Sequence, residues 1–305
     1  MNEHIGIVGS TSPIGICLAK NLSNDFYLTL SYRDKNLVSS DFINKNNIKN
    51  VYFDLQSPNF FDKNIFKKCQ TIVWVAHIMQ SYYKEEEIQI NVKAVKSFLK
   101  LIPETAVRKI VYISSGGSIY GNPLTIPIPE SHSLKPLSSY GKAKKAVEEI
   151  LIKFHERTNI KIAILRPGNI YGSEFFTKRS KGIIATYINC IQNQKPFTII
   201  GNSDAIRDYL HINDLIQAVK CAIGSKKNII LWNVGTETGY SVSYIINLIS
   251  SIFKKQAFQI SHRTVNWPEI HVNVLSNIRI TTESDWTVAI PLEIGIQRIA
   301  EQYKE

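Results

Sequence analysis

The sequence of 305 residues predicts an α/β fold, with a doubly wound parallel sheet followed by a smaller C-terminal α+β lobe. Two observations carry this prediction. The first two-thirds of the chain alternates short β-prone segments with segments of helical periodicity, which is the pattern of repeated βα units. After about residue 168 this alternation loosens. We expect a ligand between the two parts, at the carboxyl ends of the parallel strands.

The expected strands of the first part are short apolar runs, bounded by polar residues, at 4–8, 26–32, 49–53, 71–76, 109–114 and 161–166. Helices are expected between them at 14–24, 86–101 and 138–157. The second part predicts helices at 181–193, 213–224, 241–254 and 292–303, and short strands near 197–200, 230–234 and 272–275. We therefore place one domain at 1–168 and a second at 169–305, with the chain able to re-enter the first domain near 205–235.

The composition excludes several classes of protein. No run of 18 apolar residues predicts a transmembrane helix, and the N-terminus lacks the basic and apolar regions of a signal peptide. The cysteines Cys17, Cys69, Cys190 and Cys221 are scattered, which argues against a zinc or disulfide framework and fits a reducing cytoplasm. The net charge is +11, but the lysines are dispersed, so we expect no nucleic-acid partner; a basic surface would attract nucleotide diphosphates.

A glycine-containing loop joins the first strand to the first helix, which is the context that a dinucleotide-binding loop requires. The loop reads Gly9-Ser10-Thr11-Ser12-Pro13-Ile14-Gly15. Gly9 would permit the tight turn, Gly15 would let the helix pack closely on the strand, and the helix N-terminus beginning at Pro13 and Ile14 would face a pyrophosphate. Ser12 replaces the usual middle glycine, although its hydroxyl could bind phosphate. An ordinary βα turn is the alternative.

Tyr140 and Lys144 lie four residues apart at the start of a predicted helix, so they share one helical face. A free tyrosine has a pKa of about 10, and a nearby cation can lower it by roughly one to three pH units. Such a phenol suits proton exchange with a sugar hydroxyl or ketone while a hydride moves. The alternative is a surface pair that merely shares a face.

Further motifs follow in order along the chain: Asp54-Leu55, Val75-Ala76, Asn91-Val92, Ser114–Gly121, Leu165–Gly172, Ile206–Leu215, Asn233-Val234-Gly235 and Pro291–Ile296. With the Tyr140/Lys144 pair, their ordered combination resembles the extended short-chain dehydrogenases/reductases, specifically the nucleotide-sugar epimerase, dehydratase and reductase family. The resemblance covers essentially the whole chain. It implies a Rossmann domain that binds a nicotinamide cofactor and a lobe that binds a nucleotide-diphosphate sugar.

The resemblance also implies roles at matching positions. Tyr140 would be the acid/base, and Lys144 would tune it and hold the nicotinamide ribose. Further cofactor contacts are implied for Asp54, Leu55, Ala76, Asn91, Ser114 and Pro167, with Asn91 also orienting the lysine. Substrate diphosphate contacts are implied for Asn169 and Arg207, and more weakly for Arg263. Structural roles are expected for Asp208, His77 and His211.

The chain departs from the family pattern at Gly116, where Ser or Thr is usual. The hydroxyl that bridges proton transfer must then come from Ser118, which we favour, or Ser115; both could instead satisfy backbone groups. The acidic pair that drives water elimination in 4,6-dehydratases is replaced by Gly117 and Ser118, which disfavours dehydration.

The second strand ends at Arg33-Asp34, and Ser31 or Tyr32 occupies the position where NAD-selective members place an acidic residue. Arg33 could pair with a 2′-phosphate, so NADP(H) is favoured, with NAD(H) as the alternative; a solvated Arg-Asp turn is the other interpretation.

These observations favour a reductase of a 4-keto nucleotide-diphosphate sugar of the 4-keto-6-deoxyhexose type. An NAD-dependent nucleotide-sugar 4-epimerase is the alternative, and a third is a cofactor-binding regulator that has lost catalysis. A homodimer is also expected, formed through the helices at 86–101 and 138–157. The apolar residues of that face are Ile90, Val95, Leu99, Val147, Ile150 and Leu151, which could equally cover the sheet.

Overall fold

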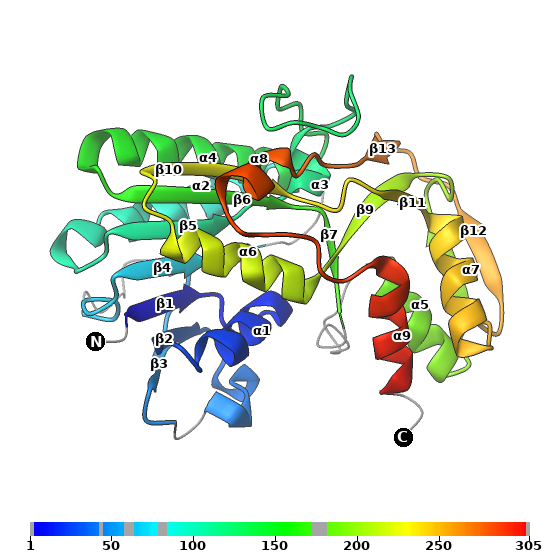
Figure 1. Cartoon of the computed structure of the whole chain (residues 1–305), viewed down its shortest axis with the longest axis horizontal. Coiled ribbons are helices and arrows are strands. Elements are labelled where there is room, and N and C mark those ends of the chain that lie inside the picture. The colour runs from blue at the N-terminus through cyan, green and yellow to red at the C-terminus, as the bar shows by residue number, and fades with distance from the viewer. Residues whose placement is uncertain (1–2, 43–44, 58–63, 79–83, 173–181, 303–305) are drawn as a thin grey trace. The chain divides into compact units, whose positions relative to one another are not determined.

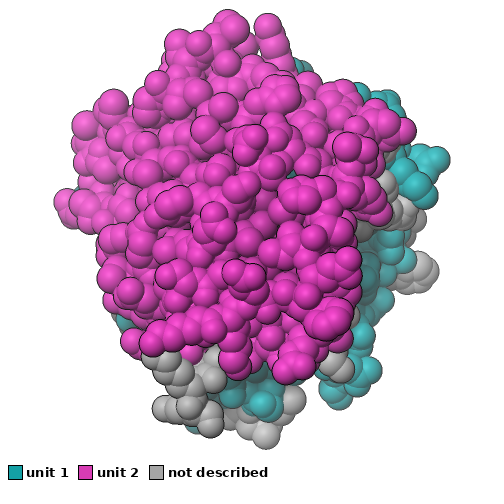
Figure 2. All heavy atoms as spheres, turned by 90° about the vertical axis from the view of Figure 1, so that its right-hand side faces the viewer, with its two compact units in different colours: residues 1–115, 138–165, 219–232 teal, residues 116–137, 166–218, 233–305 magenta. Residues whose placement is uncertain are grey.

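A computed structural model describes residues 3–42, 45–57, 64–78, 84–172 and 182–302 of the chain (Figure 1). Contacts divide the chain into two compact units that alternate along the sequence (Figure 2). Unit 1 comprises residues 1–115, 138–165 and 219–232, and unit 2 comprises residues 116–137, 166–218 and 233–305. The division at residue 168 stays a prediction, because packing alone does not tell which residues bind cofactor and which bind substrate.

A seven-stranded sheet forms the centre of unit 1, with strand order β10-β6-β5-β4-β1-β2-β3. The pairings from β3 through β6 are all parallel. The strands are β1 His4–Val8, β2 Tyr27–Tyr32, β3 Ile48–Tyr52, β4 Thr71–Trp74, β5 Lys109–Ile113, β6 Lys161–Pro167 and β10 Ile229–Val234. The order 3-2-1-4-5-6 is that of a doubly wound dinucleotide-binding sheet, whose switch point lies between β1 and β4. The predicted fold class is confirmed.

The helices that flank this sheet are α1 Pro13–Leu22, α2 Glu86–Leu99, α4 Ser139–Thr158 and α6 Ile212–Gly224, of which residues 219–224 belong to unit 1. Single-turn 3₁₀ helices add η1 Lys35–Leu37, η2 Ser40–Phe42 and η4 Ile102–Glu104. Helices α2 and α4 lie side by side (Figure 1). No helix of the described residues combines the length and apolar character that a membrane span requires.

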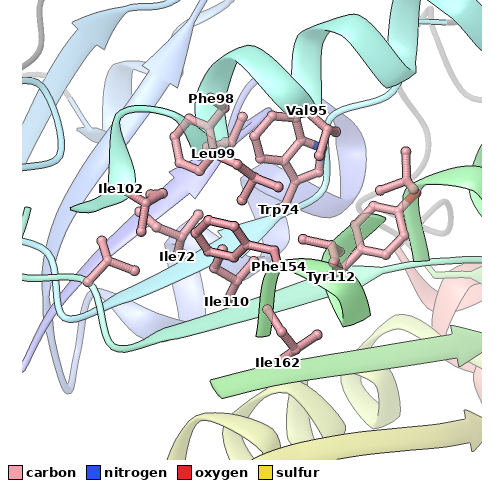
Figure 3. Packing of buried hydrophobic residues seen from close by; sticks show 14 of the residues in the cluster. Ile72, Trp74, Val95, Phe98, Leu99, Ile102, Ile110, Tyr112, Phe154 and Ile162 are labelled. Atoms are coloured by element: carbon pink, nitrogen blue, oxygen red, sulfur yellow. The ribbon is translucent and has the colours of Figure 1, made fainter. Parts of the chain in front are cut away.

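A cluster of buried aliphatic and aromatic side chains fills the space between α2, α4 and the sheet (Figure 3). Trp74 of β4 and Phe98 of α2 have ring centroids 4.9 Å apart in an edge-to-face arrangement. Four of the six apolar residues expected at a dimer face belong to this buried cluster: Val95, Leu99, Val147 and Leu151. They cover the sheet, which is the alternative that the sequence left open for them.

Unit 2 is built on a four-stranded sheet in which β9 is central, pairing with β7, β11 and β13. Its strands are β7 Asn169–Tyr171, β8 Phe197–Ile200, β9 Ile206–His211, β11 Gly239–Ser241, β12 Ile260–Arg263 and β13 Val272–Asn273. Its helices are α3 Gly116–Ile119, α5 Ile183–Gln192, α7 Val242–Phe253, α8 Ile278–Glu283 and α9 Leu292–Glu301. Strands β8 and β12 form a separate pair.

Candidate functional site

The phenol and ammonium predicted to share a helical face do so at the beginning of α4. Ser138 caps this helix by accepting a hydrogen bond from Gly141 N at 3.1 Å, which places Tyr140 in the first turn. Lys144 Nζ lies 5.6 Å from the centroid of the Tyr140 ring and donates a hydrogen bond to Ile113 O at 2.8 Å. Because Ile113 ends β5, the ammonium is anchored at the carboxyl edge of the parallel sheet, and Tyr140 beside it is partly exposed.

Lys144 is almost fully buried, and this controls its charge. Burial lowers the pKa of Lys144 to about 7, and the nearby carboxylate of Glu148 opposes that shift. Glu148 is itself buried and accepts a hydrogen bond from the Ser114 hydroxyl. The lysine therefore titrates close to neutral pH, in direct contact with the candidate acid/base.

His77 packs against Tyr140, which the sequence did not reveal. The ring centroids lie 4.7 Å apart with an interplanar angle of 75°. His77 Nε2 lies 2.9 Å from Oε1 of the buried Glu87. Burial, and secondarily the charge of Lys144, lower the pKa of His77 to about 2, so the imidazole is neutral. The available signal was position: His77 follows β4, so it stands at the same carboxyl edge as the end of β5.

Asn91 uses its side-chain amide to hold the backbone next to His77. Its Oδ1 accepts a hydrogen bond from Ile78 N at 2.9 Å, and its Nδ2 donates to Ile78 O and Glu87 O, both at 2.8 Å. The side chain is buried, so these bonds satisfy an amide that would otherwise be costly. Its predicted contacts with Lys144 and the cofactor stay predictions.

The glycine loop has the geometry that close approach to a pyrophosphate requires. Gly9 has φ +93°, and a Cβ built on it would lie 2.7 Å from Ala76 N. A Cβ on Gly15 would lie 2.2 Å from Gly9 O, so only glycine lets α1 begin this close to β1. The first-turn amides of a helix have no acceptor within the helix; in α1, Pro13 has no N–H and Gly15 N donates to Ser12 Oγ, so Ile14 N is the first-turn donor that could meet a phosphate. These residues fit a dinucleotide phosphate, which would lie against the start of α1.

Ser12 holds this loop together. Its hydroxyl donates a hydrogen bond to Gly9 O at 2.8 Å and accepts one from Gly15 N at 3.1 Å. The hydroxyl thus acts as the N-cap of α1. Its predicted contact with phosphate stays a prediction, and would require a change in this bonding.

The end of β2 carries the residues expected to select the cofactor. Ser31 is buried, and its Oγ accepts a hydrogen bond from Gly9 N at 2.9 Å, which ties β2 to the loop. Arg33 is exposed. The Asp34 carboxylate accepts a hydrogen bond from Asn36 N at 3.0 Å and caps η1. One oxygen of the Asp34 carboxylate is therefore used to cap η1, whereas the Arg33 guanidinium is exposed to solvent.

Most of the other positions of the predicted cofactor site lie in unit 1, and one lies in unit 2. Asp54 follows β3 and accepts a hydrogen bond from Gln56 N at 3.0 Å, while Leu55 packs against the aromatic cluster. Ala76 N donates to Val8 O at 3.0 Å at the switch point of the sheet. Pro167 lies at the end of β6 and belongs to unit 2.

Gly116 stands where the family usually has a hydroxyl, and its surroundings exclude a side chain. A Cβ there would lie 2.4 Å from Leu275 Cδ1 and 2.8 Å from Arg166 O. Ser115 belongs to unit 1 and Ser118 to unit 2, and both are half-buried. The choice of the bridging serine stays a prediction.

Two of the three predicted diphosphate contacts share one sheet of unit 2. Asn169 on β7 pairs with Tyr209 on β9. Tyr209 is two positions after Arg207 in the same strand, so these two side chains lie on one face of the sheet. Arg207 Nη1 donates to Ile206 O at 2.9 Å, and burial lowers the pKa of its guanidinium. Arg263 is exposed on β12, in the separate two-stranded sheet. The structure thus groups Asn169 with Arg207 and leaves Arg263 on another element.

The structural role expected for Asp208 is confirmed. Its fully buried carboxylate accepts hydrogen bonds from Thr236 N at 2.9 Å, Thr236 Oγ1 at 2.7 Å and Leu275 N at 3.2 Å. Burial raises the pKa of Asp208 to about 6. His211 is also buried, and its Nδ1 accepts a hydrogen bond from Asn213 N at 3.2 Å. Both side chains organise unit 2 around β9.

Comparison with known proteins shows what the whole chain is similar to. A dTDP-4-dehydro-6-deoxyglucose reductase of Escherichia coli is 29% identical over 280 residues, which cover 90% of this chain and 80% of the relative. A protein of Methanocaldococcus jannaschii, provisionally named a UDP-glucose 4-epimerase, is 29% identical over 272 residues, covering 86% and 87%. The crystal structure of a Thermotoga maritima UDP-glucose 4-epimerase with UDP-glucose superposes with a TM-score of 0.88 at 20% identity, covering 99% of this chain and 98% of that one.

The model of the NAD dependent epimerase/dehydratase family matches residues 5–235. The matched range contains the glycine loop, the Tyr140/Lys144 pair and all of the expected cofactor positions. The resemblance to extended short-chain dehydrogenases that the motifs indicated is confirmed, and the chain belongs to the NAD dependent epimerase/dehydratase family.

Proposed function

We propose that this protein is an NADPH-dependent reductase of a 4-keto nucleotide-diphosphate sugar of the 4-keto-6-deoxyhexose type. The single observation that carries the proposal is the pairing of Tyr140 with Lys144 at the carboxyl edge of the sheet, with the ammonium 5.6 Å from the phenol ring. When bound, the nicotinamide cofactor supplies hydride transfer. The residues of the chain supply binding, orientation and a proton.

In this proposal Tyr140 gives its phenolic proton to the C4 oxygen of the sugar. Lys144 stabilises the phenolate that remains, because a nearby cation favours the charged form of an acid. Ser118, or Ser115, holds the same oxygen in place of the missing side chain at Gly116. Asn169 and Arg207 hold the substrate diphosphate, and Arg263 stays the weaker candidate.

The cofactor would be held by the glycine loop, by Asp54 and Leu55, and by Lys144 at the nicotinamide ribose. We propose NADP(H) as the favoured form, since the exposed Arg33 could pair with a 2′-phosphate. Asp34 lies beyond the end of β2, and one oxygen of its carboxylate caps η1.

Reduction is favoured over dehydration because Gly117 and Ser118 stand where 4,6-dehydratases carry an acidic pair, and neither can drive elimination. The E. coli relative, a dTDP-4-dehydro-6-deoxyglucose reductase, supports the same choice. A specific observation also supports a second candidate, an NAD-dependent 4-epimerase: several proteins of similar fold are UDP-sugar 4-epimerases, and three of their crystal structures contain NAD.

The cofactor itself distinguishes the two candidates. A reductase must exchange oxidised for reduced cofactor in each turnover, whereas a 4-epimerase returns the hydride to its substrate and keeps NAD. We expect purified protein, denatured in acid and analysed by liquid chromatography, to release little NAD. We also expect it to oxidise NADPH in the presence of a 4-keto-6-deoxy nucleotide sugar. Stoichiometric NAD release together with C4 inversion of a UDP-sugar would establish the epimerase instead.

The role of Tyr140 is tested with Tyr140→Phe in the same assays. Loss of general acid catalysis should lower kcat by about 10²–10⁴-fold, while NADPH still binds. Tyr244→Phe is a matched control, because Tyr244 is exposed on α7 and its hydroxyl donates a hydrogen bond to Glu293, away from Tyr140 in the sequence. Full turnover by Tyr140→Phe would contradict the assignment of Tyr140 as the acid. Absence of turnover by the wild type, with NADPH bound, would favour the regulator alternative.

A further inference from the structure

The imidazole of His77 is held rigidly beside the ring of Tyr140. The backbone on both sides of it is fixed: Ala76 N bonds to Val8 O of β1 at 3.0 Å, and Ile78 is bonded twice by the Asn91 side chain. The ring itself is fixed by Glu87, one helical turn before Asn91 on α2. Two residues of one helix face therefore determine where His77 lies.

The charges around His77 keep it neutral. Its ring faces Glu87 of α2, Tyr140 of α4 and, at longer range, Lys144 of α4, whose positive charge together with burial opposes protonation. A neutral imidazole placed against a carboxylate carries its proton on Nε2 and donates it to that carboxylate. The ring can then pack on Tyr140 without adding a second cation beside Lys144.

We propose that His77 is a positioning residue for Tyr140. The imidazole, oriented by Glu87, packs edge to face on the phenol at 4.7 Å and fixes the plane of its ring, while Lys144 contacts the same ring at 5.6 Å. A neutral ring with one hydrogen-bonded orientation limits the positions that the phenol can take. This proposal rests on the proposed function of Tyr140 as the acid. It gives His77 a role in orienting that acid, where the sequence analysis expected only a structural role.

A double-mutant cycle separates this role from a structural one. His77→Ala should lower kcat on the order of 10-fold to 100-fold, since a displacement of about 1 Å can cost 10²-fold. The KM for the nucleotide sugar should change less than about threefold, because the ring does not hold the diphosphate in this proposal. In the Tyr140→Phe background the same substitution should cause no further loss, because no phenolic proton remains to be positioned. An equal loss in both backgrounds would overturn the proposal.

A second readout needs no turnover. The ionisation of Tyr140 can be followed from tyrosinate absorbance near 295 nm, as the difference between wild type and Tyr140→Phe titrated with alkali. We expect His77→Ala to shift the midpoint of this titration, because the phenol is no longer held in one position among the groups that surround it. An unchanged titration would overturn the positioning role even if no substrate is found, so its failure is distinct from failure of the proposed function.

Two further variants keep the test interpretable. His77→Gln retains a donor to Glu87 but removes the ring. It should show the loss of kcat expected for His77→Ala, and it takes the place of His77→Ala in the test if His77→Ala does not fold. His155→Ala removes a histidine of the same helix as Tyr140 whose Nδ1 instead contacts Ile160 O at 2.8 Å. It should leave both kcat and the tyrosinate titration unchanged; wild-type kcat in His77→Gln would overturn the proposal.

Discussion

At the scale of single residues, the proposed function depends on how burial changes the chemistry of Lys144. The four-residue spacing places its ammonium on the same face as the phenol, but spacing does not reveal that the ammonium is enclosed by Tyr112, Ile113 and Glu148. Enclosure lowers the pKa of Lys144 to about 7, far below its ordinary value of 10.5. The folded protein therefore binds fewer protons than the unfolded chain between these two pH values.

This difference predicts a pH dependence of stability. Because the unfolded state binds the extra proton, the free energy of unfolding should rise with pH from about 7 to 10.5, as far as Lys144 contributes. Lys144→Met should show a smaller rise than the wild type between pH 7 and pH 9, measured by urea unfolding at each pH. Identical pH slopes for the two proteins would show that Lys144 is not desolvated as described.

Gly116 is the clearest residue-scale case in which structure explains a departure from the family. The missing side chain is not an isolated loss, because Leu275 and the backbone of Arg166 occupy the space where its Cβ would lie. A substitution to serine at this position would have to displace backbone, which is costly in a packed interior. The proposed reliance on Ser118 or Ser115 follows from this crowding.

At the scale of elements, the end of α6 is stabilised by a lysine from a neighbouring strand. Lys109, at the start of β5, donates hydrogen bonds from Nζ to Ala222 O at 2.8 Å, to Ser225 O at 2.7 Å and to Ile223 O. The last carbonyls of a helix have no partner within it and carry partial negative charge. One buried ammonium thus satisfies the end of α6 and joins it to the central sheet.

Lys109→Met should therefore cost about 2 kcal/mol in the free energy of unfolding, the scale of a hydrogen bond to a charged group. The matched control is Lys161→Met, since Lys161 makes one exposed bond to Lys226 O at 3.1 Å in the same region. That control should change stability by less than about 0.5 kcal/mol. Urea unfolding at neutral pH measures both, and equal effects would show that capping of α6 contributes little.

Whether an element could be predicted from the sequence depended on its length and on how regular its apolar pattern is. The helices expected at 86–101 and 138–157 are observed as Glu86–Leu99 and Ser139–Thr158, because long periodic segments identify their buried face. Strands β7, β11 and β12 and the short helices α3 and α8 were missed, because such short segments carry little periodic signal. Strand β9 is six residues long, but Arg207, Asp208 and His211 interrupt its apolar pattern, so it was missed as well. The strand expected near 230–234 is observed as β10, which pairs with β6 in the central sheet and lies in the range, 205–235, where the chain was expected to be able to re-enter the first domain.

At the scale of the whole molecule, the expected homodimer stays a prediction. The structure reduces the number of expected interface residues that could contact a second copy. Only Ile90 and Ile150 of the six expected apolar residues are partly exposed. Ile150 lines a groove of about 920 Å³ between α2 and α4, together with the apolar side chains of Leu99 and Phe154. Its rim carries the cations Lys96, Lys100, Lys153 and Arg157, and the anion Glu156.

If two copies associate through this face, like charges come together, so salt should strengthen the dimer by screening them. We expect the dimer dissociation constant, measured by sedimentation equilibrium, to fall as the salt concentration increases from about 0.05 M to 0.5 M. Ile150→Glu should shift the protein toward monomer. Ile278→Glu is the control, because Ile278 is 64% exposed on α8 of unit 2. A dimer unaffected by Ile150→Glu would place the interface elsewhere.

The sequence by itself determined the βα alternation, the glycine loop after β1, and the spacing of Tyr140 and Lys144, because each is encoded within a few neighbouring positions. Only the tertiary structure decided that Lys144 is buried, that Gly116 can carry no side chain, and that His77 packs on Tyr140. Each of these depends on strand register and helix packing that bring together residues far apart in the chain. Burial and contact of this kind set charge and orientation, which local periodicity does not encode.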